Sequence, residues 1–403
     1  MQKPFEGIRV LEWGVFHAGP GGTAILSDMG AEVIKVEQPG TGDPVRFADY
    51  KDVTFNLPDD TNLFYAGANR GKKSITLNLG HPQGKQIAYN LVKKSDVFFT
   101  NLRPSTVKKM LMDYQTLSQI NPRLIYASVT GFGDRGPDAD RGAFDFQGQG
   151  RSGMMYSFGE PNTPPLLGQF GIVDQATAIM ASYEIVIALF MRERFGMGQE
   201  VNVSLLGTAS YLLYFNYLVL LMTGREMPRH EQATASALRN YYRCQDGNWI
   251  VLTQPPSESG WKEACHVLGH PDLVDDPRFN TERKRIENSR ELVSIFSRAF
   301  ASKPRDEWLR LCAEKKNIPI CAVNTITEAI NDAQMIENDY IVDFEHPNMG
   351  HMRIPGFPIH FSQAQVDNNL LAPELGEHTN SVLKEIGGYS DEDIAQFRED
   401  GVI

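Results

Sequence analysis

The N-terminal half of the chain alternates short apolar runs with amphipathic segments. Ile8 to Trp13 predicts a strand, Gly21 to Met29 a helix, and Glu32 to Glu37 a second strand. Two strands that are joined through a helix pair in parallel, because the chain must cross back before the second strand begins. This stretch therefore predicts a βαβ unit.

The same alternation continues further along the chain. Pro82 to Lys94 predicts a helix with proline in its first turn, and Asp96 to Thr100 and Leu124 to Val129 predict strands. Together these segments predict an α/β protein with a Rossmann-like parallel sheet and covering helices. Ligands of such sheets bind beyond the carboxyl ends of the strands, so the loop after Trp13 is the first candidate site.

One segment, Val201 to Gly224, contains no charged residue over 24 positions, which is long enough to span a membrane. Polar residues interrupt it, and Tyr211, Tyr214 and Tyr217 lie in its middle, whereas tyrosines at a membrane interface lie at the ends of a span. We therefore expect no membrane contact here. The segment instead predicts a helix that is buried on all sides, by the core or by a second subunit.

The composition changes near Gly224, where a polar stretch broken by proline begins. We predict a large α/β domain over residues 1–224, completed by residues 375–403, and a smaller α+β domain over residues 225–330. Residues 331–374 carry several prolines without regular periodicity, so we expect an extended linker there.

The totals of the chain exclude several classes of function. Its 403 residues carry a net charge of -11, which argues against general binding to nucleic acid or to anionic membranes. The four cysteines form no CxxC pair and no cluster with histidines, so neither a metal site nor a disulfide framework is expected. The first residues lack the apolar core of a signal peptide, and we expect a cytoplasmic protein.

The loop Gly14 to Gly22 is rich in glycine and could bring a phosphate to backbone amides at the next helix start. It is not the GxGxxG fingerprint, so a nicotinamide dehydrogenase has little support, although Glu37 ends the second strand where a ribose-binding acid would lie. Basic residues in the segments 69–73 and 103–109 could grip phosphates or be solvated surface charges.

Asp174 ends a stretch of small residues and precedes a long apolar run, Ile179 to Phe190, which predicts a buried helix. An acid at this point has two interpretations. It can cap the helix, because its charge meets the free N–H groups and the partial positive charge of a helix start. It can also be a catalytic acid at the mouth of that helix. The local sequence alone favours the cap.

Ordered motifs across nearly the whole chain resemble one family. They are Gly7-Ile-Arg-Val-Leu-Glu12, Ala18-Gly-Pro20, Gly30-Ala-Glu-Val-Ile-Lys-Val-Glu37, Gly40-Thr-Gly-Asp43, Asn69-Arg-Gly-Lys-Lys-Ser-Ile-Thr-Leu-Asn78, Asn101-Leu-Arg-Pro104, Asn121-Pro-Arg-Leu-Ile-Tyr126, Gly131-Phe-Gly133 and Leu375-Gly-Glu-His-Thr379. Each motif is weak alone, but the ordered set is specific. The chain resembles the class III coenzyme A transferases, the family of formyl-CoA transferase and carnitine CoA-transferase.

The resemblance implies a large α/β domain, a small domain and long linkers, with two chains interlocked as a homodimer or as a heteromer with a homologous subunit. It also implies that Asp174 is a nucleophile. Its carboxylate would attack an acyl-CoA thioester to give a mixed anhydride, and then carry CoA as an aspartyl thioester until a carboxylic acid accepts it. Coenzyme A and acyl-CoA are then substrates, and no cofactor is bound permanently. We expect the acid to be ionised at neutral pH, since the ordinary pKa of aspartate is about 3.9.

His17 is either a second active-site residue or a histidine whose hydrogen bonds are satisfied within its loop; the formyl-transferring members have a polar glutamine at this position. The resemblance implies contacts with coenzyme A for Phe16, His17, Ala18, Gln38, Leu77, Asn78, Leu79, Gly80, Asn101, Leu102, Arg103, Lys109, Phe144 and Asp145. Arg103 and Lys109 are the expected phosphate partners. Gln38 and Gly142 stand where some members have a basic residue. Further phosphate partners are therefore expected among Arg46, Arg70, Lys72 and Arg141.

Two alternatives share these features. The α-methylacyl-CoA racemases resemble this family, but they use a histidine where this chain has Phe144, which cannot accept a proton. A CoA-binding subunit without activity of its own would not need Asp174. Residues 154–158 and the aromatic residues in 211–217 either line a roomy acyl pocket or belong to the core. If they line a pocket, an aryl-substituted succinate that receives CoA from succinyl-CoA fits better than formate.

Overall fold

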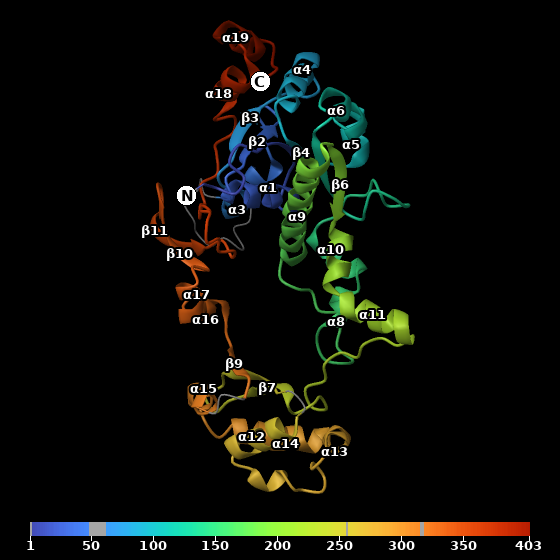
Figure 1. Cartoon of the computed structure of the whole chain (residues 1–403), viewed down its shortest axis with the longest axis vertical. Helices are drawn as coiled ribbons and strands as arrows, with labels where there is room; N and C mark the ends of the chain where they lie inside the picture. Colours follow the sequence, from blue (N-terminus) through green and yellow to red (C-terminus); the bar gives the residue numbers. More distant parts are fainter. Residues whose placement is uncertain (1, 48–61, 255–256, 315–317) are drawn as a thin grey trace. The chain divides into compact units, whose positions relative to one another are not determined.

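The computed structural model describes residues 2–47, 62–254, 257–314 and 318–403 (Figure 1). The chain divides into two compact units. Unit 1 comprises Met1–Met155, Leu167–Arg225 and Asn338–Ile403, and unit 2 comprises Tyr156–Leu166 and Glu226–Glu337. Each unit contains its own sheet and its own hydrophobic core.

Unit 1 is built on a six-stranded sheet in the order β3-β2-β1-β4-β5-β6. The strands are β1 (Arg9–Trp13), β2 (Glu32–Glu37), β3 (Lys73–Thr76), β4 (Val97–Thr100), β5 (Ile125–Thr130) and β6 (Gln199–Ser204). Neighbouring strands all pair in parallel. The predicted α/β class with a Rossmann-like parallel sheet is confirmed.

Two hydrophobic cores cover the two faces of this sheet. Successive strand residues point to opposite faces, and accordingly Val10 belongs to one core and Leu11 to the other. The first face is covered by α1 (Ala18–Asp28) and α9 (Ile172–Phe195), which pack against each other (Figure 1). The second face is covered by α4 (Pro82–Val92) and by the C-terminal segment.

Shorter helices connect these elements. They are η1 (Pro44–Phe47), α3 (Leu63–Asn69), α5 (Pro104–Lys109), α6 (Tyr114–Ile120), α7 (Asp145–Arg151) and α8 (Met154–Ser157). The chain ends in α18 (Thr379–Val382), the π-helical turn η3 (Leu383–Gly387) and α19 (Asp391–Glu399). Leu383, Ile394 and Val402 are buried in the core of the second face, so the C-terminus forms part of unit 1.

Strand β6 leads into the uncharged segment 201–224, for which the sequence predicts a single helix buried on all sides. That prediction is wrong within this chain. After β6 come α10 (Leu205–Leu212) and α11 (Tyr214–Thr223), which are bent by 72° at their junction. All of α11 is described, and none of its residues is buried by this chain. Cover by a second subunit stays a prediction.

By length and composition alone, α9 could cross a membrane, and α10 with α11 pass the same test as a bent pair. Half of the most apolar window of α9 is buried inside the protein. Ala181, Ile185 and Ala188 lie in the core on the first face of the sheet. Helix α9 is therefore a covering helix of this sheet.

Unit 2 has a three-stranded antiparallel sheet of β7 (Arg239–Arg243), β8 (Trp249–Thr253) and β9 (Ile320–Val323). Its helices are α12 (Glu258–Val267), η2 (Pro271–Leu273), α13 (Glu282–Glu287), α14 (Ser289–Phe300), α15 (Arg305–Glu314) and α16 (Ile326–Ala329). Aromatic rings fill its core, where Tyr242 stacks on Phe300 with ring centroids 4.7 Å apart.

Residues 331–374, predicted as an extended linker, contain α17 (Ala333–Glu337) and a hairpin of β10 (Ile341–His346) and β11 (Gly350–Pro355). The hairpin pairs with itself and buries little of either face, which explains why no clear periodicity reveals it. All of residues 356–374 are described, and none belongs to a helix or strand. They run along unit 1, where Asp367 N donates to Asp28 O and Gly71 N to Leu371 O.

Candidate active site

The strand order of the large sheet reverses between β1 and β4, and the loops that follow these strands meet at the carboxyl edge. Asn101 donates from Nδ2 to Val15 O at 2.7 Å and accepts from Val15 N at 2.9 Å. The loops approach closely, because a Cβ on Gly19 would lie 2.8 Å from the Asn101 Cβ. Such a switch point is where parallel sheets form a ligand crevice.

The turn after β1 presents backbone donors to this crevice. Phe16 has a left-handed φ of 59°, and α1 begins at Ala18, three residues earlier than the sequence predicts. Pro20 lies in the first helical turn, where the absence of an N–H group costs nothing. Within the described part of the chain, the amides of His17, Ala18 and Gly19 have no hydrogen-bond partner. They are candidate donors to an oxyanion or a phosphate.

Asp174 lies in the first turn of α9, which follows Gly171 with its left-handed φ of 87°. Another acid caps this helix. Oδ1 of Asp145, the first residue of α7, accepts from Val173 N at 2.6 Å and from Asp174 N at 3.0 Å. The Asp174 side chain is 8% exposed, and its carboxylate forms no hydrogen bond or ion pair with any described residue. The cap that the sequence favoured for Asp174 is therefore supplied by Asp145.

Burial raises the pKa of Asp174 to about 7, and the negative charge of Asp145 adds to the rise. The sequence-based expectation of a fully ionised acid is too simple, because it used the value of an exposed carboxyl. Burial also lowers the pKa of His17. Its Nε2 lies 2.9 Å from Gln175 Oε1, and since an amide oxygen can only accept, this ring nitrogen is the donor. The hydrogen bond ties the loop after β1 to the residue beside Asp174.

Phe144 and Arg103 border the same crevice. Phe144 precedes α7, is 60% exposed, and packs edge-to-face on Phe16 with ring centroids 5.7 Å apart. The Arg103 guanidinium lies beside Gly142, where a Cβ would be 3.0 Å from Nη2. The structure thus brings together the loop after β1, the loop after β4, the segment before α7 and the start of α9.

Other residues predicted to contact coenzyme A follow the outer strands. Gln38 is exposed directly after β2. Leu77 and Leu79 follow β3, but their side chains are buried in the core of the second face. Within residues 77–80, a contact with coenzyme A would therefore come from Asn78, Gly80 or the backbone.

The remaining predicted contacts differ in how much surface they offer. Ala18 is buried in the first turn of α1, and Leu102 packs half-buried against the core. Arg103 and Lys109 are exposed, and neither the Arg103 guanidinium nor the Lys109 ammonium forms a hydrogen bond or an ion pair with a described residue. Both cations are therefore available to a phosphate group.

Three of the four further phosphate partners that we expected are engaged inside the protein. Arg46 pairs with Glu37, Arg70 with Asp28, and Lys72 with Glu12. A cation that already neutralises a buried carboxylate is a poor phosphate ligand, because the acid would lose its partner. Arg141 lies at the surface, where its guanidinium is 3.7 Å from Asp138 Oδ1, so it is the most accessible of the four to a phosphate group.

Sequence reasoning missed Gln175 and Asp43. Nothing in the local sequence marks Gln175 as a site residue, because its contact with His17 depends on how α9 packs against α1. Asp43 accepts from Phe16 N at 3.2 Å, although it follows a different strand from the loop that it holds. The Gly40-Thr-Gly-Asp43 motif contains Asp43, but the motif indicates only the family and not the contact of Asp43 with Phe16.

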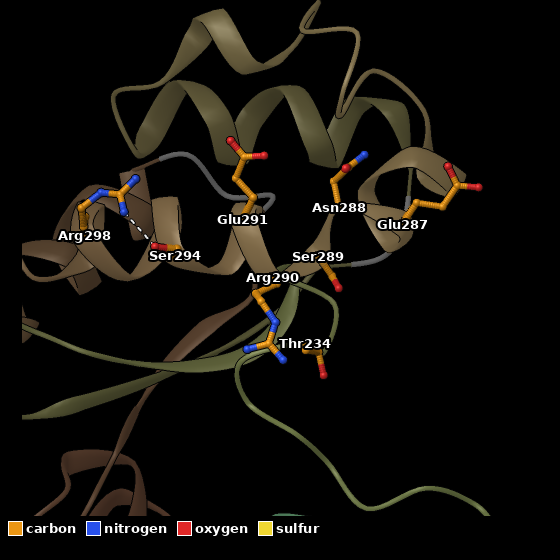
Figure 2. Close-up of a pocket in the computed structure, with 8 residues that line it drawn as sticks. All are labelled: Thr234, Glu287, Asn288, Ser289, Arg290, Glu291, Ser294 and Arg298. Atoms are coloured by element: carbon orange, nitrogen blue, oxygen red, sulfur yellow. Dashed lines mark hydrogen bonds between the residues drawn. The ribbon is translucent and has the colours of Figure 1, made fainter.

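Unit 2 has a hollow of its own, of about 620 Å³, at the start of α14 (Figure 2). It is lined by Thr234, Glu287, Asn288, Ser289, Arg290, Glu291, Ser294 and Arg298. Arg298 donates to Ser294 Oγ at 2.7 Å, and a dashed line marks this hydrogen bond in Figure 2. The predicted catalytic and coenzyme A-contacting residues all belong to unit 1, and none of them lines this hollow.

The parallel sheet, its crevice and a buried acid without a partner among the described residues define an α/β enzyme, and comparison with known proteins identifies its family. Residues 5–379 match the family model of CoA-transferase family III. The whole chain is 31% identical to 90% of the succinyl-CoA:glutarate CoA-transferase of Mus musculus. It is 33% identical to the full length of the formyl-CoA:oxalate CoA-transferase of Streptomyces avermitilis.

A solved structure gives the same result. The crystal structure of a CAIB/BAIF family protein from Brucella suis superposes with a TM-score of 0.83 at 29% identity, covering 96% of this chain and 100% of that one. The chain belongs to CoA-transferase family III. The predicted family and enzyme class are confirmed, and CoA thioesters and carboxylic acids are the substrates of this class.

Proposed function

We propose that this CoA-transferase uses Asp174 as a covalent nucleophile. The observation that supports the assignment is its carboxylate at the start of α9, which has no partner in the described part of the chain because Asp145 supplies the cap. An Oδ atom of Asp174 attacks the acyl-CoA carbonyl, the C–S bond breaks, and a mixed anhydride and CoA thiolate form. The thiolate then attacks the aspartyl carbonyl, which releases the donor acid and leaves an aspartyl-CoA thioester.

The acceptor acid reverses these steps. Its carboxylate attacks the aspartyl thioester, the thiolate leaves, and the thiolate then attacks the acyl carbonyl of the new anhydride. New acyl-CoA departs, and the Asp174 carboxylate is restored. Each tetrahedral intermediate places negative charge on an oxygen, which the amides of His17, Ala18 and Gly19 can stabilise.

We infer succinyl-CoA as the donor, and as the acceptor an acid bulkier than formate, such as an aryl-substituted succinate. The mouse relative is named for succinyl-CoA and glutarate, which supports the donor. Tyr211, Tyr214 and Phe215 form a series of edge-to-face ring contacts and are more than half exposed. They are not core residues of this chain, so they are available to an acyl group or a second subunit.

We infer an interlocked dimer with a second copy or a homologous subunit. Helix α9 exposes Ile179, Tyr183 and Phe190, and α11 exposes Leu221 and Met222 at 82% and 77%. Apolar side chains exposed over several turns are typical of subunit interfaces. Light scattering on the purified protein should give twice the chain mass of 45.1 kDa, and Leu221→Lys should weaken the dimer. A monomer at micromolar concentration would contradict the homodimer and leave a homologous subunit as the partner.

The covalent step can be tested by trapping. With an accepted acyl-CoA and no acceptor acid, a fraction of the protein should carry CoA on the peptide that contains Asp174. Hydroxylamine should release the CoA and leave a hydroxamate there, because an aspartyl thioester is far more electrophilic than a carboxylate. The matched control is Glu184→Gln, which removes another buried carboxyl of α9 and should leave the adduct in place. If donor is turned over without an adduct, direct transfer in a ternary complex is the better mechanism.

A substrate panel tests the specificity. Succinyl-CoA would be offered with glutarate, aryl-substituted succinates, oxalate and formate, and the CoA products measured by mass spectrometry. Products from formate or oxalate alone would overturn the inferred acceptor. A chiral 2-methylacyl-CoA in deuterated water should show no exchange at its α-carbon, because Phe144 cannot accept a proton.

A further inference from the structure

A cluster of charged side chains lies buried beneath the loop that follows β1. Glu12 on β1 stands opposite Lys35 on β2, Lys72 directly precedes β3, and Asp43 follows β2. Lys35 Nζ lies 2.9 Å from Glu12 Oε1 and 2.9 Å from Asp43 Oδ2, and Lys72 Nζ lies 2.7 Å from Glu12 Oε2. Two acids and two bases thus neutralise one another in the interior, and the proposed chemistry uses none of them.

Stability is a weak reason for such a cluster, because the cost of desolvating buried charges offsets much of their attraction. Its contacts with the loop are more informative. Lys35 Nζ donates to Gly14 O at 2.9 Å, and Asp43 Oδ1 accepts from Phe16 N at 3.2 Å. Three residues, 14–16, lie between β1 and His17. Lys35 therefore holds the first of them and Asp43 the last.

The residue that Asp43 holds is strained. Phe16 has a φ of 59°, a left-handed conformation that phenylalanine rarely adopts. Strain of this kind persists where surrounding contacts hold it, and it concentrates at functional sites. The hydrogen bond from Phe16 N to Asp43 is such a contact, and Lys35 fixes Asp43 in turn. The turn at Phe16 directs the chain into α1, so it sets where the amides of His17 and Ala18 lie.

We propose that Asp43, held by Lys35, is a positioning residue for CoA transfer. It fixes the left-handed turn at Phe16 and, through this turn, the amide donors at the start of α1 that serve the site of Asp174. The inference rests on the proposed function, because it takes those amides to stabilise the tetrahedral intermediates. Asp43 acts through the loop and need not touch a substrate.

The test compares two aspartates of similar chemistry. Asp43→Asn keeps an oxygen for Phe16 N but places an amide against the Lys35 ammonium. The control is Asp96→Asn at the amino end of β4, the opposite end of the strands from the site. Asp96 also pairs with a cation, Arg192 at 2.9 Å, and accepts a backbone amide, Arg9 N at 2.8 Å. Both variants should lose stability, but only Asp43→Asn should disturb the loop.

The expected result is a split between kcat and KM. Asp43→Asn should lower kcat by about 30-fold or more with KM within threefold, because misplaced oxyanion donors act on the transition state. Asp96→Asn should keep kcat within about threefold of the parent. Peptide-level hydrogen exchange over residues 14–17 should quicken by tenfold or more in Asp43→Asn and stay unchanged in Asp96→Asn. Equal kcat losses in the two variants, or unchanged exchange in Asp43→Asn, would overturn the proposal.

Two measurements keep the proposal open to refutation if Asp43→Asn does not fold or if the proposed function fails. In the unaltered protein, the Phe16 amide should exchange at least tenfold more slowly than the His17 amide, because Phe16 N donates to a buried acid and His17 N has no partner among the described residues. Equal exchange of the two amides would refute the positioning. Failure of the proposed function has a different signature, namely no CoA adduct on Asp174 in the unaltered protein.

Discussion

Unit 1 buries carboxylates in two neighbouring regions that behave in opposite ways. In the charge cluster, burial alone would raise the pKa of Glu12, but Lys35 and Lys72 outweigh it and lower the pKa to about 2. At the start of α9, burial raises the pKa of Asp174 to about 7, and Asp145 adds to the rise because it is also negative. Burial acts in the same direction on both carboxyls, so the presence or absence of neighbouring cations decides whether the pKa is lowered or raised.

The difference separates a structural acid from a functional one. Glu12 has every partner that it needs, and its charge is stabilised in the folded state. Asp174 is enclosed without a cation among the described residues, which makes its ionised form costly and its carboxylate reactive. An acid kept in this state despite the cost to stability is a sign of function. Substitutions at Asp174, Glu12 and Asp145 each remove one of the features that make the two regions different.

The largest effect is expected from Asp174→Asn. The amide is nearly the same size but cannot form the anhydride, so kcat should fall by about 10⁴-fold or more. The circular dichroism spectrum and the affinity for CoA should be retained, since Asp145 continues to cap α9. Steady-state kinetics with the best substrate pair decide the matter. Activity within tenfold of the parent would show that Asp174 is not the nucleophile.

The second largest effect is expected when an acid of the charge cluster is removed. Glu12→Gln leaves Lys35 and Lys72 with one acid fewer in a buried site, and the free energy of unfolding at pH 7 should fall by about 3–5 kcal/mol. The folded pKa of Glu12 lies below its unfolded value, so its contribution is present above about pH 4.5 and is lost as pH falls toward 2. Urea unfolding at pH 7 and pH 3 should therefore give a smaller difference at pH 3. An equal or larger difference at pH 3 would contradict this account.

Removal of the Asp174 carboxyl should also change the stability of the protein. The folded pKa of Asp174 lies above its unfolded value, so ionisation at high pH works against the fold. Asp174→Asn should therefore stabilise the protein at pH 8, on the order of 2 kcal/mol or more. The gain should shrink as pH falls from 7 toward 4, where the parent acid is protonated in the folded state. A loss of stability at pH 8 would mean that an interaction of Asp174 has been overlooked.

Much of this picture was accessible from the sequence. Apolar alternation predicted β1, β2, β4 and β5, and the motif order predicted the family that the comparisons confirm. Local patterns determine these features, because each strand is buried and each motif is contiguous. Strand β6 was missed because its residues Gln199–Ser204 are mostly half-buried and lead into an uncharged helical segment.

The site was harder to predict, because its contacts join segments that lie far apart in the chain. No local pattern shows that Asp145 caps the helix of Asp174, or that His17 meets Gln175. The pKa of a carboxyl likewise depends on what surrounds it in space. One signal was present and was not used: Glu12 and Lys35 interrupt apolar strands, and a charge within a buried strand needs a partner on its neighbour.

The smallest effect is expected from Asp145→Asn, which leaves Asp174 unpaired but removes the like charge beside it. The asparagine oxygen can still accept from Val173 N and Asp174 N, so the start of α9 should keep its shape. Without the negative neighbour, the ionised form of Asp174 is less disfavoured and its pKa should fall. In the parent, kcat/KM should decline as pH drops through about 7, because this ratio follows the ionisation of the free enzyme.

In Asp145→Asn the midpoint of this decline should lie at lower pH, so the variant retains a larger share of its own maximal kcat/KM at pH 6 than the parent does. Glu184→Gln is the control, because it removes a buried carboxyl of the same helix that does not contribute to the pKa of Asp174. Its midpoint should match the parent. A midpoint that stays in place in Asp145→Asn would leave burial as the sole cause of the raised pKa. The contrast between the two regions would then rest entirely on the cations that Glu12 has and Asp174 lacks among the described residues.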